Sequence, residues 1–211
     1  RRAKAAWDAG YFKKSIVPVK DQNGIELLAH DEFLRPTTTM PTLAALEPSF
    51  KMQGEMMPGF NAVAQQRYPE VEKIRHVHHA GNSSGVVDGA AAVLLASPDY
   101  AAAHGLTARA RVVATANMGD DPTLMLNAPV PAARKVLERA GLTIDDIDLF
   151  EINEAFAVVA EKFMRDLDLD RDKVNVNGGA MALGHPIGAT GAMLIGTVLD
   201  ELERTDGQFG L

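Results

Sequence analysis

The sequence predicts an α/β protein built in layers. Strand-like and helix-like segments alternate between Ala110 and Leu211, which is typical of a layered α/β unit. A glycine-rich loop at residues 175–188 leads directly into the last apolar repeat with helical spacing. The first 80 residues differ, because they are rich in Met, Pro and Gly around residues 52–60 and have no sustained period. We therefore predict three parts: a covering or loop segment (1–80), a short connecting part (81–108) and a C-terminal α/β unit (109–211).

The connecting part and the first half of the α/β unit contain these expected elements. Residues 90–96 are a strand-like run that ends at Ser97-Pro98, and residues 111–115 form a second such run. Pro131 stands at an expected helix start and Gly141 at its expected stop. Residues 147–152 are then the next predicted strand.

The second half of the unit continues the alternation. Helical spacing over residues 156–167 is followed by a short strand-like run at 174–176 and by the glycine loop. A final helix is expected to begin near Ile187. Its apolar positions recur at i, i+3, i+4 and i+7, and they are Ile195, Val198, Leu199 and Leu202.

Composition narrows the class of protein but does not identify it. The 211 residues are 46% apolar and 23% charged, enough for one sizeable core or parts of two. The net charge of −7 argues against nucleic acid or an anionic membrane as the main partner. No apolar run reaches membrane-spanning length, and no signal peptide is recognisable after the first residue, Arg1. We expect a cytoplasmic location, with an organellar location as the alternative.

His185 is the first candidate for chemistry. It lies in the loop Gly178-Gly179-Ala180-Met181-Ala182-Leu183-Gly184-His185-Pro186-Ile187-Gly188. Glycines fill no space, so their number here indicates a backbone that bends sharply and approaches something closely. At the entrance of a helix, backbone N–H groups favour developing negative charge. The alternative is a histidine that only caps or packs the turn.

Asn153 and Glu154 form a second candidate site, at a predicted junction between strand and helix. Asparagine is a common N-cap residue, and that role is one interpretation. In the other, its neutral amide holds a water molecule or a carbonyl oxygen, as an oxyanion site requires.

Four blocks in order resemble the thiolase family. They are Asp31-Glu32-Phe33-Leu34-Arg35-Pro36, Gly81-Asn82-Ser83-Ser84-Gly85, Asn153-Glu154-Ala155-Phe156 and Asn177-Gly178-Gly179 through Gly184-His185-Pro186-Ile187-Gly188. Together they extend over nearly the whole chain. The resemblance implies a three-layered α/β/α fold, of which this chain would hold the C-terminal half and the covering segment.

The resemblance also implies a reaction and the residues that perform it. A thiolase transfers an acyl group between 3-ketoacyl-CoA and CoA, in thiolysis during fatty-acid degradation or in the reverse condensation. His185 and Asn153 would be catalytic, His185 assisting the nucleophile and Asn153 fixing a water. Ser84, Gly188 and Glu154 are candidates for the substrate and CoA site. The alternatives are a structural serine in a glycine-flanked turn for Ser84, and for Glu154 either orienting the Asn153 loop or favouring a helix N-terminus. Acyl-CoA and CoA would be the partners, with no separate cofactor and no metal, and the complete enzyme would be a homodimer or homotetramer.

The absence of cysteine departs from the family pattern. Thiolases use two cysteines, so we interpret the chain as part of a longer enzyme, inactive alone. The alternative is a cysteine-free, non-catalytic relative that binds acyl-CoA or lipid. A β-ketoacyl synthase would share the fold, but the Asn153 block and the His185 loop favour a thiolase.

A cluster of three other histidines, His76, His78 and His79, does not match any zinc-site spacing. We expect no metal there. Their position just before residues 80–82 leaves open that they face the acyl-CoA cleft.

Overall fold

The computed structural model describes residues 1–211. Its elements are α1 (Arg2–Asp8), β1 (Val19–Lys20), β2 (Glu26–Leu28), α2 (Met40–Ala44), α3 (Lys51–Met56), α4 (Pro58–Arg67), α5 (Pro98–Ala103), α6 (Pro129–Ala140), α7 (Ala157–Leu167), α8 (Ala180–Leu183) and α9 (Ile187–Thr205). Three short 3-10 turns lie at Ala80–Asn82, Ile144–Asp146 and Arg171–Lys173. No helix is both long enough and apolar enough to cross a bilayer.

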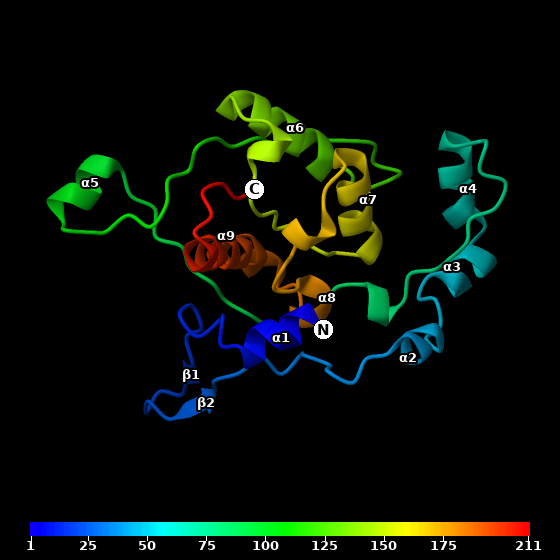
Figure 1. The fold of residues 1–211 in the computed structure, drawn as a ribbon. Coiled ribbons are helices and arrows are strands. Elements are labelled where there is room, and N and C mark those ends of the chain that lie inside the picture. Colours follow the sequence, from blue (N-terminus) through cyan, green and yellow to red (C-terminus); the bar gives the residue numbers. More distant parts are fainter.

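The core lies in the C-terminal unit. Figure 1 shows α6 and α7 on one side of this unit, with α8 and α9 on the other. Apart from Ala3 and Ala6 of α1, every buried residue lies within residues 130–201. One apolar cluster fills the space between α6, α7 and the extended segments beside them: Val130, Ala133, Leu137, Ile147, Phe150, Ile152, Ala160, Phe163, Met164, Leu167 and Val174.

The helices of this unit follow the sequence pattern closely. α6 begins at Pro129, two residues before the predicted start, and Gly141 ends it with φ of +68°, the left-handed conformation that glycine adopts without strain. α7 presents Ala160, Phe163 and Leu167 to the core. α9 begins at Ile187 as predicted and ends at Thr205.

Strand pairing is much sparser than the sequence predicts. The predicted strands at residues 90–96 and 111–115 are not formed, and no backbone-to-backbone hydrogen bond involves residues 86–96 or 107–119. Residues 147–152 and 174–176 do lie side by side, but their backbone pairing is limited to an isolated parallel bridge between Phe150 and Val174. A second bridge joins Leu149 to Gly210. These runs have strand composition, but a strand also needs a neighbour that supplies hydrogen-bonding partners.

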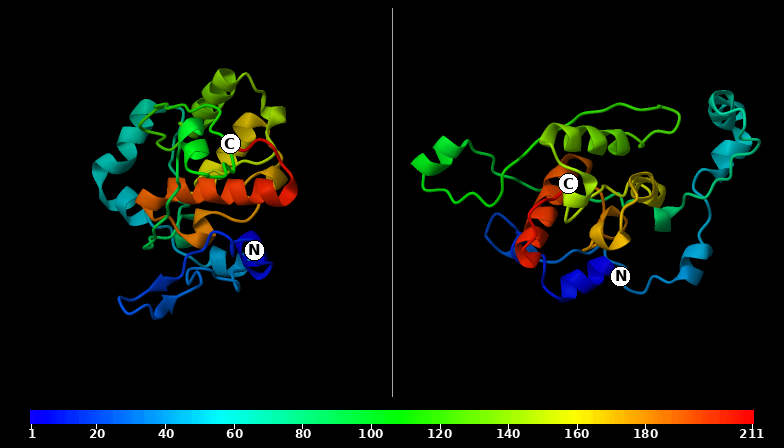
Figure 2. Two further views of the ribbon diagram at one scale, coloured as in Figure 1. Left: turned by 90° about the vertical axis from the view of Figure 1, so that its left-hand side faces the viewer. Right: turned by 45° about the horizontal axis from the view of Figure 1, so that its top comes forward.

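The N-terminal part is more regular than predicted. β1 and β2 form a small antiparallel hairpin, and α2, α3 and α4 form an arm on the opposite side of the molecule from α5 (Figure 2). α1 contacts the C-terminal unit. The Arg2 guanidinium donates to the carbonyls of Arg171 and Val174 at 2.9 and 2.7 Å. The division at residues 80 and 108 stays a prediction.

Candidate active site

Three loops from distant parts of the sequence meet beside α8. The Ser84 amide donates to the Ala155 carbonyl at 2.9 Å, and Ser83 forms an antiparallel bridge with Phe156. The His185 amide donates to the Gly85 carbonyl at 2.9 Å. Residues 83–85 therefore tie the loop before α7 to the glycine loop before α9.

The structure brings together the two predicted catalytic residues. The Asn153 amide nitrogen lies 3.2 Å from Nε2 of His185, across 32 residues of sequence. Asn153 is not the N-cap of α7, since that position belongs to Phe156, and the N-cap interpretation is wrong. The amide oxygen of Asn153 is buried and has no hydrogen-bond partner in the protein. A buried acceptor of this kind can take a donor from a bound water or ligand.

Glu154 holds these two loops at a fixed separation. Glu154 is 9% exposed, and its carboxylate accepts from the Asn175 side chain at 3.0 Å and from the Met181 amide at 3.1 Å. Asn175 in turn exchanges hydrogen bonds with both backbone groups of Ile152, each at 2.9 Å. Both Glu154 oxygens are thus engaged within the protein, which supports the orienting role over direct contact with CoA.

Two glycines of the His185 loop adopt backbone angles that other residues avoid. Gly178 has φ of +85° and Gly184 has φ of +86°. A methyl group at Gly178 would also overlap Ala3 of α1, and one at Gly184 would overlap the Val87 side chain. The sharp bends and close approaches inferred from the glycine-rich sequence are confirmed at these two positions.

Gly188 lines an open groove beside this loop. The groove has a volume of about 460 Å³ and runs between residues 87–91 and the first turn of α9. A methyl group at Gly188 would meet no other atom within 4 Å. Packing within the chain therefore does not require glycine at this position.

Contacts that the sequence analysis missed hold the glycine loop and His185 in place. The Asn177 amide donates to the Glu201 carboxylate of α9 at 2.8 Å, and both side chains are buried. Burial alone would oppose ionisation of Glu201, but donation from Arg204 and Asn177 lowers the pKa of this carboxyl. Thr190 contacts the other ring nitrogen of His185. Sequence spacing does not identify these partners, because helical periodicity reports apolar faces rather than buried polar pairs.

His78 lies against the loop that carries Asn153. Its ring is 4.7 Å from that of Phe156, and Phe50 contacts the same two rings. Burial lowers the pKa of His78, and the neighbouring His79 and His76 lower it further. The cluster joins the α2–α4 arm to the site through aromatic packing. Nowhere in the structure do three His, Asp or Glu side chains gather in a way that could hold a metal ion.

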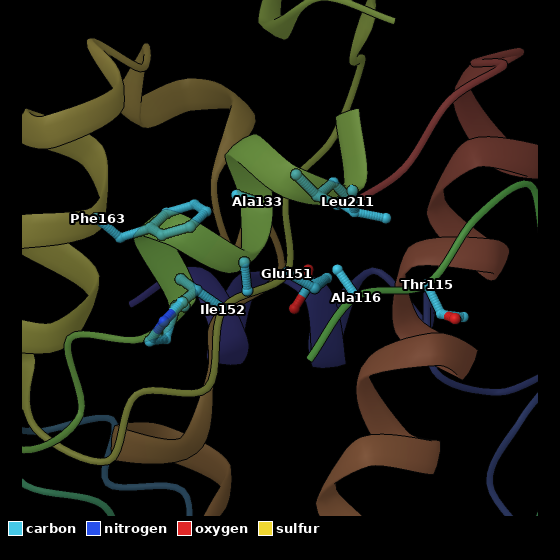
Figure 3. Close-up of a pocket in the computed structure, with 10 residues that line it drawn as sticks. Thr115, Ala116, Ala133, Glu151, Ile152, Phe163 and Leu211 are labelled. Atoms are coloured by element: carbon cyan, nitrogen blue, oxygen red, sulfur yellow. The ribbon is translucent and has the colours of Figure 1, made fainter. Parts of the chain in front are cut away.

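A second cavity contains a carboxyl group that the sequence analysis did not single out. Glu151 projects among Ala133, Ile152 and Leu211 at a cavity of about 340 Å³ (Figure 3). Burial raises the pKa of Glu151 to about 8, with smaller contributions from the negative charges of Glu154 and Glu201. None of the predicted site residues lines this cavity.

Comparison with known families shows which family the chain belongs to. The family model described as "Thiolase, C-terminal domain" matches residues 106–211, and "Thiolase, N-terminal domain" matches residues 1–63. The chain belongs to the thiolase family.

Individual thiolases resemble the whole chain. It is 43% identical to a 3-ketoacyl-CoA thiolase of Serratia proteamaculans, with 100% of this chain and 51% of that protein covered. It is 45% identical to the 3-oxoadipyl-CoA/3-oxo-5,6-dehydrosuberyl-CoA thiolase of Escherichia coli, with 100% of this chain and 48% of that protein covered. The chain thus spans about half the length of the curated relatives it matches.

A solved thiolase structure agrees with the fold. Human mitochondrial 3-ketoacyl-CoA thiolase in complex with CoA superimposes with a TM-score of 0.78 at 37% identity, over 99% of this chain and 47% of that one. The chain therefore has the thiolase α/β fold, although few of its strands are paired.

Proposed function

We propose that this chain supplies one half of a thiolase active site, which transfers acyl groups between 3-ketoacyl-CoA and CoA. The observation that carries the proposal is the 3.2 Å approach of the Asn153 amide nitrogen to His185 Nε2. A polar pair of this kind, drawn from two separate loops and held by a buried glutamate, suits stabilisation of charge on a reacting oxygen.

In the proposed reaction, a cysteine thiolate outside this chain attacks the keto carbon of 3-ketoacyl-CoA. The bond between the α and β carbons breaks, and its electron pair forms the enolate of acetyl-CoA, which then takes up a proton. The acyl group remains on the cysteine as a thioester until the thiol of CoA displaces it. His185 Nε2 would accept the cysteine proton and then donate a hydrogen bond to the thioester oxygen.

Asn153 would act through its unpaired side-chain oxygen. That oxygen is buried without a partner, and a water bound there would present a second donor to the thioester oxygen. Removing one such donor typically lowers the rate by about 10²–10³-fold. Gly188, which lines the groove beside α9, would contact CoA there. Ser84, which lies outside the groove lining, would contact CoA from the neighbouring segment.

The binding partners follow from the same scheme. Acyl-CoA and CoA enter as substrates, and we propose no separate cofactor.

We further propose that the complete enzyme is a homodimer or homotetramer. Light scattering during size-exclusion chromatography of the complete enzyme tests the oligomer. The cytoplasmic location stays a prediction.

A chimeric enzyme tests the function. The aligned half of the Serratia proteamaculans 3-ketoacyl-CoA thiolase is replaced by residues 1–211, and thiolysis of acetoacetyl-CoA is measured. We expect turnover that falls about 10²–10³-fold in His185→Ala and in Asn153→Ala. The exposed control variant Asn117→Ala is expected to keep full activity, since its side chain makes no hydrogen bond in the structure.

The chimera also separates the two functional interpretations. A folded chimera that binds CoA but lacks all thiolysis would favour the non-catalytic acyl-CoA-binding alternative, which the absence of cysteine from this chain permits. Full activity in the His185→Ala chimera would overturn the catalytic roles assigned above.

A further inference from the structure

We propose that Thr190 is a positioning residue that fixes the tautomer and ring orientation of His185, so that Nε2 carries the reactive lone pair. This inference rests on the proposed acyl-transfer function, which gives the tautomer its chemical consequence. Thr190 lies in the first turn of α9 and is buried, 6% exposed. Its hydroxyl oxygen is 2.6 Å from Nδ1 of His185.

The position of the hydroxyl proton follows from the geometry of the helix start. The Thr190 amide donates to the Pro186 carbonyl at 3.1 Å, and the Thr190 hydroxyl donates to the same carbonyl at 3.2 Å. A threonine hydroxyl has one proton and two acceptor lone pairs. With its proton directed to Pro186, the hydroxyl can only accept from His185, so Nδ1 carries a proton.

The contact at Nε2, on the other side of the imidazole ring, selects the same tautomer. The Asn153 amide nitrogen, 3.2 Å from Nε2, is a donor and not an acceptor. Nε2 must then present a lone pair. The contacts of Thr190 and Asn153, which come from different elements, therefore both select the neutral Nδ1–H form.

The tautomer decides which atom can exchange protons. Nδ1 is engaged with the helix, so only Nε2 faces the place where Asn153 leaves an unpaired acceptor. A neutral imidazole in water favours the opposite tautomer, with its proton on Nε2. Without Thr190, a larger share of His185 would carry its proton on Nε2 and could not act as a base there.

Nuclear magnetic resonance tests this directly on the 211-residue chain. Long-range correlations between ring carbon-bound protons and ring nitrogens, recorded with ¹⁵N-histidine, show which nitrogen is protonated at neutral or slightly alkaline pH. The signals of His185 are assigned as those that vanish in His185→Gln. We expect the Nδ1–H pattern in the wild-type chain and in Thr190→Ser, which keeps the hydroxyl.

The matched variant Thr190→Val keeps the size of the side chain but removes the acceptor, and we expect its His185 to shift toward the Nε2–H pattern. Unchanged amide signals from α6 and α7 would show that the core is intact. An Nε2–H pattern in the wild-type chain would overturn the proposal even if Thr190→Val did not fold. An unaltered pattern in a folded Thr190→Val chain would overturn it as well.

The chimera adds a kinetic readout. There Thr190→Val should lower kcat about tenfold or more while KM changes much less, by analogy with the loss found when a partner that orients a metal-bound histidine is removed, and Thr190→Ser should keep kcat near that of the wild type. If the chimera shows no thiolysis at all, the proposed function fails, whereas the tautomer is still decided by the spectra of the chain alone.

Discussion

The side-chain amide of Asn177 donates to the carboxylate of Glu201 at 2.8 Å, and this buried contact fastens the glycine loop to α9. Asn177 directly precedes Gly178, whose bend leads toward His185. The loop is therefore held by two carboxylates, those of Glu201 and of Glu154, which accepts from the Met181 amide. Changes at these contacts should disturb the loop without touching His185 itself.

Asn177→Asp should destabilise the chain at neutral pH. The substitution keeps the shape but places a second carboxylate against Glu201, where both side chains are less than 7% exposed. We expect a loss of about 2–4 kcal/mol in the free energy of unfolding, and a smaller loss near pH 4, where one carboxyl can be protonated. Urea unfolding followed by fluorescence of the single tryptophan, Trp7, measures it. The exposed control Asn117→Asp should change stability by less than about 0.5 kcal/mol, and an equal effect in both variants would contradict the prediction.

Glu154→Gln should also destabilise the chain. The glutamine has one acceptor oxygen where the carboxylate uses two, so its amide group would face either the Asn175 side chain or the Met181 amide, both of which are donors. The expected loss is about 1–3 kcal/mol, measured by chemical or thermal unfolding. Glu138→Gln makes the same chemical change on the exposed face of α6 and should leave stability nearly unchanged. An unfolding midpoint for Glu154→Gln equal to that of the wild type would show that the Glu154 carboxylate does not stabilise the contact between the two loops.

Gly184→Ala and Gly188→Ala form a matched pair. Gly184 has φ of +86° and faces Val87, so an added methyl group should cost about 1–3 kcal/mol. Gly188 has open space around it, and its substitution should leave stability within about 0.5 kcal/mol. Unfolding experiments compare the two. In the chimera, Gly188→Ala should raise KM for CoA if substrate approaches that backbone, and an unchanged KM would remove Gly188 from the binding site.

Glu151→Gln should remove a pH dependence of stability. The pKa of Glu151 is about 8 in the folded chain and near 4.5 when unfolded. Below pH 4.5 the carboxyl group of Glu151 is protonated in both the folded and the unfolded chain, so it does not lower the free energy of unfolding. As pH rises from 4.5 to 8, the unfolded state releases the proton first, and the free energy of unfolding falls.

The neutral variant should therefore be more stable than the wild type by roughly 2–4 kcal/mol near pH 8.5, and by much less near pH 4.5. The comparison requires unfolding curves for both chains across this pH range. Glu138→Gln serves again as the control and should follow the wild type throughout. Parallel pH profiles for Glu151→Gln and the wild type would show that Glu151 titrates normally.

The isolated 211-residue chain should show no thiolysis of acetoacetyl-CoA. It contains no cysteine, and the proposed reaction needs a thiolate as nucleophile. The measurement compares the purified chain with buffer, with His185→Ala as a further control. Clear turnover that survives purification and disappears in His185→Ala would overturn the mechanism with an external cysteine.

Much of the local structure was predictable because it depends on short-range physics. Gly141 ends α6, and α9 begins at Ile187, since left-handed glycine and helical apolar spacing act within a few residues. The family resemblance also implied that Asn153 and His185 act together, and the structure places their side chains 3.2 Å apart. By contrast, the strand predictions at residues 90–96 and 111–115 failed, because a strand needs a partner that its own sequence does not specify.

The sequence by itself determined the thiolase family and the helices of the C-terminal unit, and it singled out Asn153 and His185 as candidate catalytic residues. Only the tertiary structure decided that Asn153 contacts His185 rather than capping α7. It also decided that Glu154 hydrogen-bonds two loops, that Thr190 contacts His185 and that Glu201 binds the glycine loop. These are contacts between buried polar groups brought together by packing. Their energies depend on distance and burial in three dimensions, and no periodicity along the chain encodes them.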